Sequence, residues 1–106
     1  MNPANHNAEN ARTARNAVMA CPSCYSGAKL VFLNLANAAD IDGLSGVDRS
    51  FVPFESVLAM TPGKDRTTVL RALQRLAQCG HVQILQLPSS SNGYVRHRNL
   101  YRVVMP

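Results

Sequence analysis

The stretch of sequence that decides the fold is residues 58–80, LAMTPGKDRTTVLRALQRLAQCG. It begins with the end of a short helix, turns at Thr-Pro-Gly (61–63), and continues as a long amphipathic helix that starts after Asp65. The Asp65 carboxylate can accept hydrogen bonds from the free backbone N–H groups of Thr67 and Thr68, and its charge suits the positive end of the helix dipole. This order of elements predicts a helix-turn-helix.

The two faces of the long helix differ in chemistry. Val69, Leu73 and Leu76 recur at helical spacing, so one stripe can be buried against the body of a domain. Long or polar hydrogen-bond donors on the exposed side of such a helix are what recognition of a DNA major groove requires. The opposite face carries donors of this kind: Arg66, Thr67, Arg71, Gln74, Arg75 and Gln78.

Positive charge is concentrated in the half of the chain that holds this motif. The 106 residues have a formal net charge of +5. From residue 61 onward seven basic side chains stand against one acid, a net of +6, whereas residues 1–60 carry a net of −1. A basic face attracts a polyanion, most commonly nucleic acid, although a solvated surface can have the same pattern.

The length and the hydrophobic content of 46% allow one small domain. Residues 1–25 are expected to form an N-terminal arm, disordered over 1–7 and helical over 8–20. A further helix is expected from Ser26 to about Asp40, and because its apolar side chains cover more than one face, it needs cover from outside its own domain. This predicts a homodimer formed through the N-terminal half. The side chains concerned are Leu30, Val31, Phe32, Leu33 and Leu35.

A basic β-hairpin is expected after the long helix, which Gly80 should end. Residues 81–87 (HVQILQL) and 99–105 (NLYRVVM) have the composition of paired strands. Residues 88–98 between them supply a polar tip with Asn92-Gly93, a strong turn signal. With a minimal strand at 51–52 and a helix after Pro53, the expected order is helix, short strand, helix, helix, strand, strand. The fold class is α+β, mainly α with a small β-hairpin.

At this point the chain resembles the winged helix-turn-helix domains of bacterial, plasmid and phage replication and regulatory proteins. The matching stretches are AKLVFLNLANAADIDG (28–43), FVPFESVLAMTPGKDRTTVLRALQRLAQCGHV (51–82) and RNLYRVV (98–104). The resemblance implies a winged helix-turn-helix DNA-binding domain over residues 26–106, preceded by the N-terminal helical extension. Two positions depart from the family: Lys64 stands where an apolar residue is usual, and Asp65 replaces the usual serine cap.

The resemblance also implies a set of DNA contacts. The first turns of the long helix would face the groove, the next turn would meet the DNA backbone, and the hairpin would act as a basic wing. The arginines could instead be solubilising surface residues, and Thr68 could be half-buried against the preceding helix. The implied DNA-binding residues are Lys64, Arg66, Thr67, Thr68, Arg71, Arg75, Arg96, His97 and Arg98.

The three cysteines give a competing interpretation. Cys21 and Cys24 have the C-x-x-C spacing of a zinc half-site, and Cys79 and His81 could supply two more ligands. Against this, the C-x-H spacing is tighter than usual, there is no second C-x-x-C, and an apolar core is already available. We therefore expect free thiols with no metal and no cofactor, and a zinc or redox sensor is the alternative.

The sequence contains no nucleophile with a spaced base and no Gly-rich phosphate loop, so we expect no enzyme. With no signal-like start and no apolar run of about 18 residues, a cytoplasmic protein without a membrane span is expected. We expect no small-molecule effector domain. The expected function is a sequence-specific double-stranded DNA-binding transcriptional regulator, a repressor that binds an inverted-repeat operator as a homodimer. The alternative is a winged-helix interaction or DNA-binding module of a plasmid or phage replication or partition complex.

Overall fold

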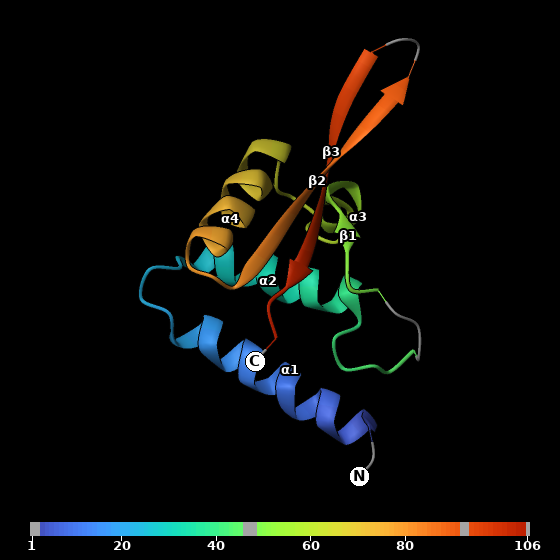
Figure 1. The fold of residues 1–106 in the computed structure, drawn as a ribbon. Helices are drawn as coiled ribbons and strands as arrows, with labels where there is room; N and C mark the ends of the chain where they lie inside the picture. Colours follow the sequence, from blue (N-terminus) through green and yellow to red (C-terminus); the bar gives the residue numbers. More distant parts are fainter. Residues whose placement is uncertain (1–2, 46–48, 92–93, 106) are drawn as a thin grey trace.

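The computed structural model describes residues 3–45, 49–91 and 94–105, without the side chains of residues 3–8, 88–91 and 94–98. Within these residues, helices accompany a three-stranded antiparallel sheet, so the chain is a small α+β protein (Figure 1). None of the helices described is both long and apolar enough to cross a membrane. The elements in chain order are α1 (Pro3–Ala20), α2 (Ser26–Ala39), β1 (Val52–Pro53), α3 (Phe54–Ala59), α4 (Arg66–Gln78), β2 (Val82–Ser91) and β3 (Tyr94–Val103).

Helix α4 begins and ends where its local sequence predicts. At its start, the Asp65 carboxylate accepts the backbone N–H of Thr68 at 2.8 Å. At its end, the N–H groups of Gly80 and His81 donate to carbonyls of the last turn. Gly80 has a φ of 82°, the left-handed conformation that closes this kind of helix end and favours glycine. The stripe between these two ends is buried, and it consists of Val69, Ala72, Leu73 and Leu76.

The turn between α3 and α4 is anchored to α2 through Thr61, whose side chain is almost fully buried. Its hydroxyl donates to the carbonyl of Val57 at 2.9 Å and accepts from Nδ2 of Asn34 at 3.0 Å. Because both roles of this buried hydroxyl are filled, the turn carries no desolvation penalty there. The start of α4 is thereby fixed relative to α2.

Strand β3 is the centre of the sheet, whose order is β1-β3-β2. On β3, Tyr101 lies opposite Val52 of β1 and is fully buried. The Tyr101 ring centroid is 6.3 Å from that of Phe54, so the sheet and α3 share one core. Strand β2 is an edge strand, which tolerates Pro88 within its ladder.

The β2–β3 hairpin is longer than the sequence predicts. Pairing continues as far as Ser91 opposite Tyr94, so the predicted strands over 81–87 and 99–105 were too short and the predicted tip over 88–98 too long. The predicted turn residues 92–93 lie outside the described part of the chain. Figure 1 shows this arm extending beyond the body, and its sequence lacks the alternating hydrophobicity that marks a half-buried strand. Three predicted wing residues therefore lie on β3 and not in a loop: Arg96, His97 and Arg98.

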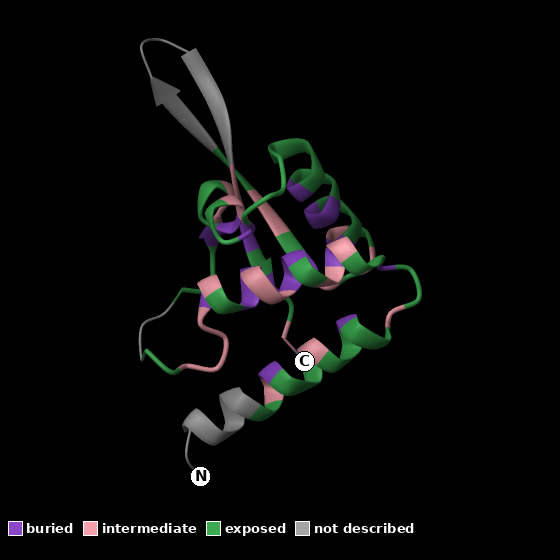
Figure 2. Cartoon of the chain, turned by 180° about the vertical axis from the view of Figure 1, so that it is seen from behind, coloured by how far each residue is buried: buried purple, intermediate pink, exposed green. Residues whose placement is uncertain are grey.

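Helix α2 is covered on two sides by its own chain. The sheet and α4 pack on one side, and α1 lies across the other (Figures 1 and 2). Val18 of α1 is fully buried in the same core as Phe32, and Arg15 forms a two-pronged ion pair with Asp42 at 2.8 and 2.9 Å. Helix α1 includes residues 3–7, so the prediction that they are disordered was wrong. Helix α1 supplies cover for α2 that the sequence predicts from a second copy of the chain.

Candidate nucleic-acid interface

The outer face of α4 carries exposed polar side chains and no acid. The helix has 13 residues, which corresponds to about 20 Å. The segment from Arg71 to Gln78 spans about 10 Å of this length, roughly three base steps of B-DNA. Every member of the predicted polar face is exposed: Arg66, Thr67, Arg71, Gln74, Arg75 and Gln78.

A shallow groove of about 280 Å³ lies beside the second half of α4. One of its lining residues is Tyr25, which directly precedes α2 and is 48% exposed. Sequence reasoning missed Tyr25, because only the packing of α2 against α4 brings it to this face. The groove joins an aromatic hydroxyl to two guanidinium and two amide groups, a donor-rich surface suited to phosphates and base edges. Its lining is Tyr25, Arg71, Gln74, Arg75 and Gln78.

Arg66, unlike Arg71 and Arg75, is paired with α3. Its guanidinium nitrogen lies 2.8 Å from a Glu55 carboxylate oxygen, and its central carbon lies 5.0 Å from the centroid of the Phe54 ring. Both charged side chains are largely exposed, and an ion pair of this kind is worth about 1 kcal/mol at most. A DNA phosphate could therefore replace Glu55 as the partner of Arg66.

The N-cap of α4 also engages the side chain of Thr68. The hydroxyl and the backbone N–H of Thr68 both lower the pKa of Asp65, the hydroxyl more strongly. Thr68 is exposed and not half-buried, yet its hydroxyl is held by the cap. Lys64 is exposed in the preceding turn. Of these residues, Lys64 is the better placed to meet a phosphate.

The predicted wing residues lie on the projecting part of β3. Figure 1 shows the hairpin extending past the body at the end of the molecule where α4 begins. The side chains of residues 96–98 lie outside the described part of the structure. Their backbone positions are set by strand pairing, in which Arg96, His97 and Arg98 lie opposite Ser89, Pro88 and Leu87.

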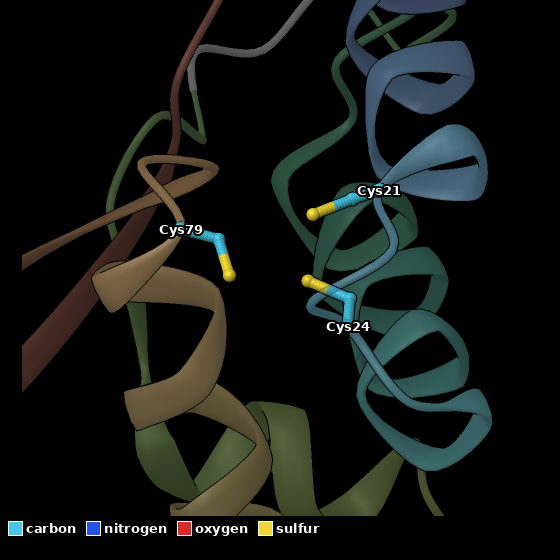
Figure 3. A group of neighbouring side chains, drawn as sticks. All are labelled: Cys21, Cys24 and Cys79. Atoms are coloured by element: carbon cyan, nitrogen blue, oxygen red, sulfur yellow. The ribbon is translucent and has the colours of Figure 1, made fainter.

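Three cysteines that are distant in sequence meet at the other end of α4 (Figure 3). Cys21 and Cys24 come from the connection between α1 and α2, and Cys79 directly follows α4. Their three Sγ atoms all lie within 4.8 Å of one another. The sequence identifies all three residues as candidates, and the fold brings them together.

His81 lies beside this cysteine cluster. Its imidazole interacts with the Cys21 thiol and is the main reason that the pKa of Cys21 falls to about 6. Burial, by contrast, raises the pKa of the Cys24 thiol to about 12. The Nε2 atom of His81 is buried and makes no hydrogen bond of normal length with any described group. The three thiols thus lie together, and the imidazole of His81 approaches one of them, Cys21.

The chain was also compared with known proteins. No protein-family model matches it, and neither the curated proteins nor the solved structures contain a match. The winged helix-turn-helix resemblance therefore stays a prediction.

Proposed function

We propose that this protein is a sequence-specific double-stranded DNA-binding transcriptional regulator that places α4 in the major groove. The observation that carries the proposal is the exposed, acid-free face of α4, where two arginines and two glutamines line one groove. A helix about 10–12 Å in diameter fits a major groove about 12 Å wide. Arginine pairs with guanine and glutamine with adenine through two hydrogen bonds each, so this face has the donors to distinguish base pairs.

Charge outside this face supports the same proposal. Residues from 61 onward carry a net charge of +6, and Lys64 is exposed at the turn that precedes α4. In the proposed complex Lys64 contacts a phosphate, and the hairpin contacts the DNA backbone or the adjacent minor groove. The basic hairpin residues concerned are Arg96, His97 and Arg98. We also propose a cytoplasmic location for the protein.

We further propose that the protein acts as a repressor and binds an inverted repeat as a homodimer, with half-sites about 34–36 Å apart or a multiple of this. Since α1 covers the second face of α2, the apolar character of α2 no longer requires a partner. What still supports a homodimer is that Met19 on α1 and Leu30 on α2 are 40% and 45% exposed. Sedimentation at micromolar concentration tests this, and a monomer that binds DNA one to one would contradict it.

The main experiment is selection of bound fragments from a random duplex pool, followed by titrations on the selected sequence and on random DNA. Arg71→Ala should cost about 1–3 kcal/mol on the selected sequence and much less on random DNA, because it removes a base contact. The matched control is Arg12→Ala, which removes the same charge from an exposed position on α1 and should bind normally.

The outcomes of this experiment separate the proposed function from its alternative. The variants Arg96→Ala and Arg98→Ala should each weaken binding to the selected and the random DNA by a similar factor. Each should also lower the salt slope, the slope of log affinity against log salt concentration, by about one unit. If no sequence is enriched and the protein co-purifies with replication proteins, the interaction module of a replication or partition complex is the correct function. If Arg71→Ala and Arg12→Ala have the same affinity for the selected sequence, α4 is not the recognition element.

A further inference from the structure

We propose that Cys21, Cys24, Cys79 and His81 bind a single Zn²⁺ ion that joins the α1–α2 connection to the end of α4. The three Sγ atoms lie within 4.8 Å of one another. Zinc–sulfur bonds of about 2.3 Å in a tetrahedral site place sulfur atoms about 3.8 Å apart, so the thiols need to approach by only about 1 Å. Three thiolates and one imidazole form a donor set of structural zinc sites.

His81 supplies the fourth ligand. A buried ring nitrogen without a partner is unfavourable, and the Nε2 atom of His81 is in that state. His81 and Cys79 both approach Cys21, although only one residue separates them in the chain. That residue, Gly80, has a left-handed φ of 82° and turns the chain sharply. The C-x-H spacing, which counts against zinc in the sequence, is thus accommodated by the end of α4.

The C-x-x-C turn is suited to holding thiolates. The Cys24 N–H donates to the Cys21 carbonyl at 3.4 Å, which closes the turn. Cys24 is only 4% exposed, and a buried thiol keeps its proton unless a positive charge compensates for the lost hydration. A zinc ion provides that charge, and binding releases the thiol protons to water without any change of oxidation state.

A purely structural role for these cysteines explains less. Cys24 packs in the apolar core, where a free cysteine behaves as a small hydrophobic residue. That role does not account for the convergence of two further thiols, Cys21 from the α1–α2 connection and Cys79 just after α4. Nor does it account for the His81 nitrogen that lacks a hydrogen bond. The zinc proposal accounts for both, and it replaces the sequence-based expectation of free thiols.

The test is the zinc content of the full-length protein, purified under reducing conditions without chelator. We expect equimolar zinc that survives dialysis and is released when a mercurial reagent blocks the thiols. Cys24→Ser and Cys79→Ser should lose it, whereas Ser23→Ala, an exposed substitution in the same turn, should keep it. Cobalt substitution should give thiolate-to-cobalt charge-transfer absorption, which reports sulfur ligands directly.

Substitution of the histidine makes the test independent of folding defects. His81→Ala should weaken zinc binding, and His81→Cys should restore it, because four cysteines also form a tetrahedral site. Zinc in the wild-type protein no higher than in Cys24→Ser would overturn the proposal. So would a disulfide between Cys21 and Cys24 that persists under these reducing conditions, detected as a mass lower by two hydrogen atoms. No DNA is present in these measurements, so their outcome is separate from that of the proposed DNA binding.

Discussion

Replacing Glu55 with glutamine is expected to increase DNA affinity, because Glu55 competes with phosphate for Arg66. The two side chains are 2.8 Å apart in the free protein, and both are largely exposed. If Arg66 of the wild-type protein already leaves Glu55 to bind DNA, binding costs the wild type an ion pair worth about 0.2–1 kcal/mol. The variant has no such cost, so its affinity should be higher by about 1.4- to 5-fold. If Arg66 contacts a phosphate only in the variant, that new contact releases about 0.9 counterion. At about 0.1 M salt this raises the DNA affinity about eightfold.

The assay is fluorescence anisotropy on the selected duplex and on random DNA across a salt series. A phosphate contact carries no sequence information, so Glu55→Gln should strengthen binding to both DNAs alike. Glu9→Gln on α1 is the matched control, since it removes the same charge from an exposed position on the far side of α2. Arg66→Ala should abolish the effect of Glu55→Gln. Equal affinities for Glu55→Gln and Glu9→Gln would refute the role assigned to Arg66.

Three further predictions concern stability, measured by urea unfolding. Thr61→Val should lower the free energy of unfolding by about 1–2 kcal/mol, because it removes the hydroxyl that donates to the Val57 carbonyl and accepts from Asn34 of α2. Thr61→Ser keeps the hydroxyl and should lower it less. Gly80→Ala should cost about 1 kcal/mol through its φ of 82° alone, since no atom lies within 4 Å of an added Cβ. The hydrogen bond with Arg15 lowers the pKa of Asp42 below 3.8, against the opposing effects of burial and a nearby carboxylate. The stability from this pair is present above the unfolded-state pKa and lost as pH falls through the lowered one, so wild type and Asp42→Asn should differ at neutral pH and converge in acid.

Features of this fold that depend on neighbours in sequence can be predicted from the sequence. Asp65 and Gly80 mark the two ends of α4 because capping involves backbone groups only a few residues away. The length of the hairpin could not be predicted in the same way, since the sequence of its outer part lacks alternating hydrophobicity. The cover over α2 could not be predicted either, because the apolar face of α2 indicates that cover is needed without indicating that α1 provides it.

The parts of the candidate sites that escaped prediction are contacts between distant segments. Tyr25 joins Arg71 and Arg75 in one groove only because α2 starts beside the end of α4. The pairing of Arg66 with Glu55 depends on how α3 packs against α4. Cys79 also meets the C-x-x-C turn only through packing, since 54 residues separate it from Cys24. Spacing rules describe ligands that are close in sequence, so they could not predict that these three cysteines lie together.

The proposed zinc site and the groove of α4 share the same two segments. Tyr25 directly follows Cys24, and Gln78 directly precedes Cys79, so the ligands flank two residues that line the groove. A metal ion that fixes Cys24 against Cys79 therefore also fixes Tyr25 against the last turn of α4. The hairpin projects at the other end of α4 and would be little affected. Removal of zinc should thus lower the ratio of affinities for the selected and random DNA, while the salt slope, which counts phosphate contacts, stays unchanged. A fall in the salt slope with an unchanged affinity ratio would show that the metal acts elsewhere.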